Sequence, residues 1–190
     1  MRKIKDVEEK RLQMAYSMSR IHGKSINEKF SVASVFIQWC RWWDYDFTMN
    51  GGFKPTIYYD QLVASKESAK MIQPEHIQYY NKLLTNVRDW ILAHYDVESS
   101  TRDNSNKFRE QLMQLRADHY EKLSQIAQDK SNGEYYVVDG SSVHHPGRLG
   151  KYWVYKHGED KKHLYFAGTY DYTLEYLNKT LPKICGKTEK

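Results

Sequence analysis

The sequence changes character at Asn132-Gly133, and this change constrains the fold more than any other feature. Before it, apolar side chains recur at three- and four-residue spacing, as in Leu84, Val87 and Ile91, which is typical of amphipathic helices. After it come short runs rich in aromatic and β-branched residues, which predict strands. The predicted fold class is α+β: a mainly helical body with a small C-terminal three-stranded antiparallel sheet plus a helix.

Residues 1–130 are expected to form the helical body. Helices are predicted over residues 7–21, 27–43, 74–95 and 107–129, with Gly23 ending the first and Pro74 opening the third. The polar stretch 98–106 has no apolar anchor and predicts a loop. Asn50-Gly51 lies between two aromatic or β-branched runs, so a short hairpin near residues 44–59 is one expectation and an ordered loop is the other.

Residues 131–190 are expected to form a small β-β-β-α module. Strands are predicted at residues 134–139, 151–157 and 162–167, with a loop at 140–150. Thr169 or Asp171 can cap the last helix, and Leu174, Leu177 and Leu181 would be its buried positions. A sheet with one helix across a face is the simplest closed arrangement of these elements.

Composition bounds the class of protein. Hydrophobic residues make up 40% of the 190 residues and charged residues 28%, a balance that predicts a folded chain rather than a disordered one. No apolar run approaches the roughly 20 residues that cross a bilayer, and the basic N-terminus lacks the apolar stretch of a secretion signal. The two cysteines, Cys40 and Cys185, form no metal or disulfide motif. We therefore expect a cytoplasmic protein with reduced thiols, no membrane partner and no cofactor.

The formal net charge of +5 is unevenly placed. Residues 1–30 and residues 141–190 each carry +4, and the residues between them carry −3. Basic ends could meet a nucleic-acid backbone or an acidic partner. Solvated lysine-rich ends are equally ordinary in small proteins, so the charge alone does not decide between these interpretations.

The strand pair 151–157 and 162–167 leaves one register question open. With a two- or four-residue loop, Trp153 and Tyr155 share a face with Leu164 and Phe166, and Trp153 is a core residue. With a three- or five-residue loop, Trp153 and Tyr155 instead share a face with Tyr165. Either register places aromatic rings beside Lys or His on one face.

Rings that stack on bases beside cations that hold phosphates are typical of single-strand nucleic-acid platforms. Non-catalytic nucleic-acid binding through this module is therefore the leading functional hypothesis. Its candidate site residues are Arg148, Lys151, Trp153, Tyr155, His163 and Tyr165. The competing structural interpretation is that the aromatic residues only cover a small core.

Two further hypotheses stay open. In the first, the same aromatic surface binds or inhibits a protein partner; the many Lys, Asn and Tyr residues would suit an AT-rich phage or mobile element. In the second, a metal-dependent hydrolase or nuclease uses Asp44 and Asp46, or His144 and His145. The common catalytic motifs are absent from the sequence, which favours a non-enzyme.

Overall fold

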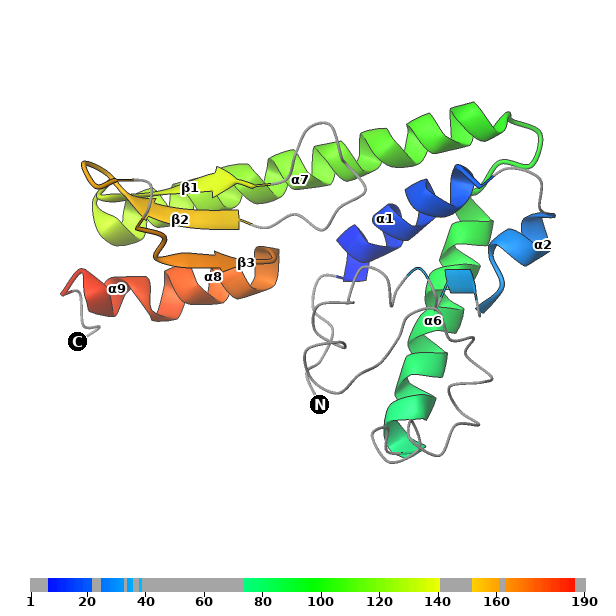
Figure 1. Cartoon of the computed structure of the whole chain (residues 1–190), viewed down its shortest axis with the longest axis horizontal. Helices are drawn as coiled ribbons and strands as arrows, with labels where there is room; N and C mark the ends of the chain where they lie inside the picture. The colour runs from blue at the N-terminus through cyan, green and yellow to red at the C-terminus, as the bar shows by residue number, and fades with distance from the viewer. Residues whose placement is uncertain are drawn as a thin grey trace. The chain divides into compact units, whose positions relative to one another are not determined.

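The computed structural model describes residues 7–21, 25–32, 34–35, 38, 74–140, 152–160 and 163–186 (Figure 1). It is mostly helical with a three-stranded antiparallel sheet near the C-terminus, which confirms the predicted α+β class. The chain divides into two compact units: unit 1 holds residues 1–3 and 11–109, and unit 2 holds residues 4–10 and 110–190. The possible hairpin near 44–59 lies outside the described residues.

Unit 1 is helical in its described part. It contains most of α1 (Val7–Ser19), α2 (Ile26–Lys29), α6 (Pro74–His94) and the start of α7 (Thr101–Ser131). Its core is formed by apolar side chains that recur at helical spacing, namely Met14, Met18, Phe30, Leu84, Val87, Ile91 and Phe108. The predicted helices over 7–21 and 74–95 are thereby confirmed, because their spacing identified the side that becomes buried.

The predicted helix over 27–43 is interrupted at Phe30. Ser25 caps α2 through a capping box with Glu28, and Phe30 forms the C-cap of this short helix. Ser31 then begins a new turn, since its hydroxyl accepts the backbone N–H of Ser34 at 3.1 Å. The hydroxyl competes with the continuing helix for backbone groups, a local effect that apolar periodicity does not register.

Helix α7 begins at Thr101, six residues earlier than predicted from the apolar pattern. The Ser100 hydroxyl accepts the backbone N–H of Asp103 at 3.1 Å and donates to the Asp103 carboxylate at 2.7 Å. Buried Asn104 also ties the first turn to Asp96, with hydrogen bonds of 2.7 and 2.8 Å to its backbone. Polar capping therefore starts this helix before its first apolar anchor.

The junction between α7 and the sheet lies where the sequence changes character. Asn132 and Gly133 take the left-handed φ values of 54° and 79°, and the Gly133 N–H donates to the Gln128 carbonyl at 2.9 Å. The Ser131 hydroxyl donates to the Ala127 carbonyl at 2.7 Å and accepts the Tyr135 N–H at 2.9 Å. The helix thus ends in a Schellman-type turn that leads directly into the first strand.

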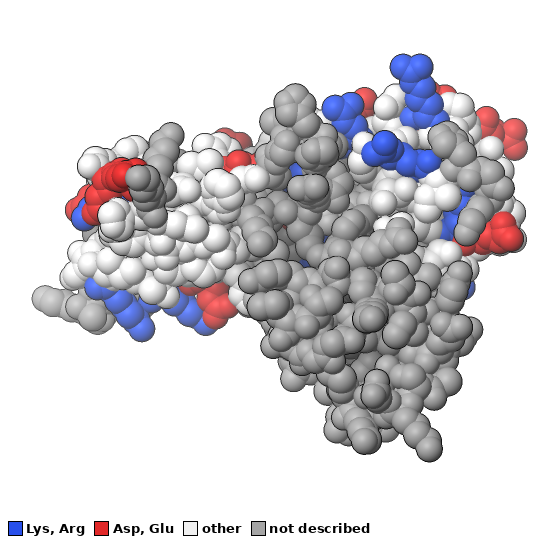
Figure 2. All heavy atoms as spheres, viewed as in Figure 1, with Lys and Arg blue, Asp and Glu red and all other residues white. Residues whose placement is uncertain are grey.

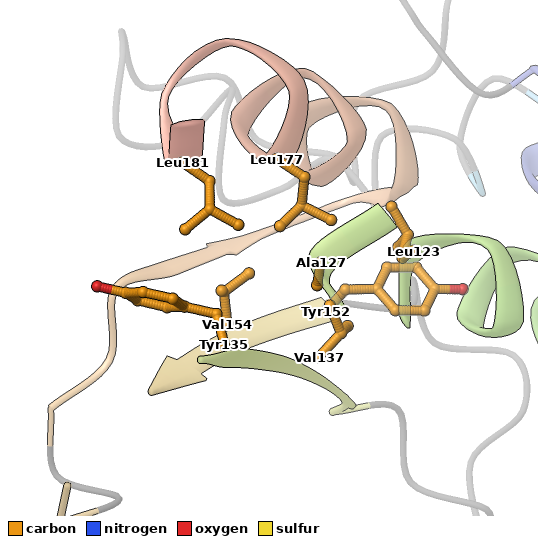
Figure 3. Close-up of a cluster of buried hydrophobic side chains, with 8 residues drawn as sticks. All are labelled: Leu123, Ala127, Tyr135, Val137, Tyr152, Val154, Leu177 and Leu181. Atoms are coloured by element: carbon orange, nitrogen blue, oxygen red, sulfur yellow. The ribbon is translucent and has the colours of Figure 1, made fainter. Parts of the chain in front are cut away.

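In unit 2, the end of α7 and the C-terminal helices pack on the same side of the sheet. Strands β1 (Tyr135–Asp139), β2 (Tyr152–Lys156) and β3 (Phe166–Gly168) pair in the order β1-β2-β3, followed by α8 (Tyr170–Lys179) and α9 (Leu181–Ile184). The buried cluster combines strand residues with helix residues: Tyr135, Val137, Tyr152, Val154, Leu123, Ala127, Leu177 and Leu181. Figure 3 shows the strand side chains directed toward the helices that cover this inner face.

The register places Trp153 on the outer face. Val154 lies opposite Phe166 and Trp153 opposite Ala167, while Val137 lies opposite Val154. Since side chains alternate between the faces of a strand, Trp153 and Tyr155 point away from the buried cluster. The connection runs over residues 157–165 and is longer than the loops considered above. It has an odd number of residues, as in the three- or five-residue case, and Trp153 therefore lies outside the core.

Candidate functional site

The outer face of the sheet carries a row of mutually packed aromatic rings. The Tyr136 and Tyr155 rings stack at 5.8 Å between centroids, the Tyr136 and His157 rings lie 4.5 Å apart, and Trp153 meets Tyr155 edge-on at 6.5 Å. Tyr136, Trp153 and Tyr155 are all partly exposed. We call Tyr136, Val138, Trp153, Tyr155, Ala167 and the adjacent His157 the aromatic face.

The structure brings together only some of the predicted site residues. Trp153 and Tyr155 are neighbours on the aromatic face. His163 is exposed in the β2–β3 connection, and the Tyr165 ring turns to the inner side, where it meets Tyr135 edge-on at 5.0 Å. Arg148 and Lys151 lie outside the described residues. Tyr136 was absent from the predicted set, and the register of β1 with β2 places it opposite Tyr155.

A cluster of charged side chains lies at the end of the sheet near His157. The Lys156 ammonium lies 3.7 Å from a Glu134 carboxylate oxygen and 3.9 Å from one of Glu159. The Tyr165 hydroxyl donates to the other Glu159 oxygen at 2.7 Å. We call Glu134, Lys156, Glu159 and Tyr165 the end cluster; one cation there faces two carboxylates, so its net charge is negative.

Glu159 also sets the acid–base behaviour of Tyr165. The hydrogen bond to the carboxylate, burial, and the nearby negative charge raise the pKa of Tyr165 above its ordinary value of about 10. The protonated phenol is therefore favoured in the folded state; its contribution to stability is present below the ordinary pKa and is lost as pH rises through the raised one.

We expect the substitution Glu159→Gln to lower the pKa of Tyr165 toward its ordinary value. The neutral amide still accepts a hydrogen bond but removes the negative charge that disfavours phenolate. Ultraviolet difference titration of the folded protein would measure this shift, and Asp160→Asn is the matched control at the neighbouring exposed carboxylate. Equal titration of the two variants would contradict the assigned role of Glu159.

An open groove of about 360 Å³ runs between α7 and the free edge of β1. Tyr120, Ser124 and Gln128 line it from α7, and Gly133, Tyr135, Tyr136, Val137 and His157 line it from the sheet side. The Ser124 Oγ is buried and has no hydrogen-bond partner among the described residues. The groove therefore combines an aromatic wall, a strand edge and an unsatisfied hydroxyl.

Unit 2 also contains a buried ionic contact between Glu9 on α1 and Arg116 on α7. The Arg116 Nε lies 3.3 Å from one Glu9 carboxylate oxygen, and the two side chains are only 6% and 1% exposed. His119 Nδ1 lies 3.9 Å from the other oxygen, and the His119 ring stacks on Tyr170 at 3.7 Å. This contact ties the first turn of α1 to α7 and α8.

The described part of unit 2 carries charges of both signs, in separate places. Acidic residues outnumber basic ones among its described residues. In Figure 2, uncharged side chains cover most of the sheet and α8 of this unit, acidic side chains gather where β2 joins β3, and basic ones lie along α8 and α9. Among the described residues, the charged side chains where β2 joins β3 are mainly acidic.

Comparison of the chain with protein-family models, curated proteins and solved structures found no match. Among the described residues, no group of three or more His, Cys, Asp or Glu side chains could hold a metal ion; Asp44, Asp46, His144 and His145 lie outside them. No helix in the part of the chain that the structure describes is long and apolar enough to cross a membrane.

Proposed function

We propose that this protein is a non-catalytic binding protein whose aromatic face docks on a protein partner. The observation that carries the proposal is the row formed by Tyr136, Trp153 and Tyr155, three partly exposed rings held against one another on a regular sheet. Tyr and Trp are the residues most enriched in the energetically dominant centres of protein interfaces.

The rings are ordered before any partner binds. Each is fixed by a neighbouring ring and by a strand backbone whose register is set by the buried inner face. Little side-chain entropy is then lost on association, because the rings already occupy defined positions. Rigid aromatic anchors of this kind suit a hot spot.

Charge separates this proposal from nucleic-acid binding. A polyanion is held by Lys and Arg, and its affinity falls steeply with salt. Among the described residues at the His157 end of the sheet, the ion-paired side chains Glu134, Lys156 and Glu159 carry a net negative charge. This surrounding favours a protein partner that is neutral or basic at the contact.

The test is capture and titration of the partner. The full chain would be cross-linked to proteins of the source cells, the captured protein purified, and its affinity measured for the wild type, Trp153→Ala and Tyr155→Ala. Loss of a hot-spot ring is expected to weaken binding roughly 30-fold. The matched control is Met113→Ala, a 41% exposed apolar residue on α7, which should leave the affinity unchanged.

Two results would contradict the proposal. One is a captured protein that binds all four forms of the chain equally. The other is salt-dependent binding of DNA or RNA that Trp153→Ala abolishes, measured by fluorescence anisotropy at low and moderate salt.

A further inference from the structure

Among the described strands β1 lies at the edge of the sheet, and it presents hydrogen-bonding groups to the groove. The His157 N–H donates to the Glu134 carbonyl at 2.8 Å, so Glu134 and His157 form a hydrogen-bonded pair. Such pairs alternate with non-hydrogen-bonded ones along an antiparallel ladder, which makes Val137 and Val154 a non-hydrogen-bonded pair. The backbone N–H and carbonyl of Val137 therefore point away from β2.

Two independent contacts support this assignment. The Tyr135 N–H, two residues before Val137, is directed to the Ser131 hydroxyl rather than to β2. The Val154 carbonyl accepts the Tyr165 N–H at 3.0 Å, on the side of β2 that faces β3. Val137 lines the groove, and no described backbone group pairs with it from that side.

The opposite wall of the groove offers a further hydrogen-bonding group. Ser124 on α7 holds its buried hydroxyl without a partner, and Gln128 lies one turn further along the same side of the helix. An exposed strand edge beside such groups is suited to receiving an extended segment, whose main chain pairs with the edge. The groove volume of about 360 Å³ falls in the lower part of the ~300–1,000 Å³ range of binding clefts.

We infer that the groove binds an extended, basic peptide segment of the partner protein as an additional strand on β1. The charge of the segment follows from the end cluster: among the described residues, Lys156 is the cation near both Glu134 and Glu159, and the Glu134 side chain is 56% exposed. An Arg or Lys of the peptide would meet this excess negative charge and could lie over the Tyr136 ring. The inference rests on the proposed function, whose aromatic face shares Tyr136 and His157 with the groove.

The segment would be selected from a phage-displayed library of random linear peptides, panned on the full chain. We expect the enriched peptides to alternate β-branched or aromatic residues with polar ones and to carry Arg or Lys. One enriched peptide would then be synthesised and its affinity measured by fluorescence anisotropy. Binding should also slow amide hydrogen exchange at Val137, because its outward N–H becomes bonded to the peptide.

Two variants test the location of the peptide. Val137→Pro removes the outward N–H without removing a bond of the β1–β2 ladder, and edge strands tolerate proline on that side. Gln128→Trp fills the groove from an exposed position, and Gln125→Trp, also exposed on α7, is its matched control. We expect Val137→Pro and Gln128→Trp each to weaken peptide binding at least tenfold, while Gln125→Trp leaves it unchanged.

Because Val137 is also buried, its variant would first be checked for native circular dichroism; Gln128→Trp does not depend on that check. An enriched peptide that binds Gln128→Trp as tightly as Gln125→Trp, or a library that yields only acidic peptides, would overturn the inference. If the partner protein depends on Trp153 and Tyr155 but not on Gln128, the strand-addition inference fails while the proposed function stands. If it depends on none of the three, the proposed function fails.

Discussion

Replacing Arg116 by methionine is expected to lower the free energy of unfolding by about 3–5 kcal/mol, although arginine is usually a surface residue. The Arg116 side chain is 6% exposed and its Nε lies 3.3 Å from the 1% exposed Glu9 carboxylate. Removing the guanidinium takes this counter-charge from a buried carboxylate, so less of the cost of desolvating that charge is offset. Urea denaturation followed by circular dichroism measures the change.

A control and a mutant cycle separate the ionic contact from a general effect of losing a charge. Lys122→Met alters an exposed side chain on the same helix and is expected to change stability by no more than about 0.5 kcal/mol. Combining Arg116→Met with Glu9→Leu should cost less than the sum of the two single changes, because the double variant removes the carboxylate together with this counter-charge. If Arg116→Met costs no more than Lys122→Met, the assigned contact between α1 and α7 is wrong.

The sequence predicted the elements of this fold better than their ends. The change at Asn132-Gly133 marks the end of α7 because both residues adopt positive φ. Asn and Gly are the residues that adopt positive φ most readily, so this end of the helix can be predicted from the local sequence. The start of α7 was predicted too late, because a first turn made of polar residues contributes no apolar periodicity. The spacing of Ser100 and Asp103 was the available signal.

The sheet register depended on information that periodicity lacks. Alternation showed that Trp153 and Tyr155 share a face, but the length of the connection decided which face is buried, and no turn motif fixes a connection over residues 157–165. Tyr165 departs from simple alternation because its ring packs on Tyr135 and its hydroxyl bonds to Glu159. Such tertiary contacts override a pattern based on neighbours in the chain.

The groove could not have been proposed from the sequence. Its walls come from α7 and β1, which are adjacent in the chain, but its depth depends on the turn at Gly133 that folds the strand back beside the helix. Ser124 and Gln128 look like ordinary polar positions of an amphipathic helix until that turn is known. The burial of Arg116 could not be predicted either, because only the three-dimensional packing brings Glu9 to it.

The second large effect is expected in the core beneath the aromatic face. Leu177→Ala should lower the free energy of unfolding by about 2–5 kcal/mol, because the fully buried side chain of α8 would leave a cavity against the sheet. Leu164→Ala is the matched control: Leu164 is 47% exposed in the β2–β3 connection, so the same chemical change there removes little packing. Urea denaturation of both variants provides the comparison, and equal losses would contradict the packing of α8 on the inner face. That packing fixes the sheet that carries Tyr136, Trp153 and Tyr155. If Leu177→Ala remains folded but binds the partner more weakly, the ordered positions of these rings contribute to binding.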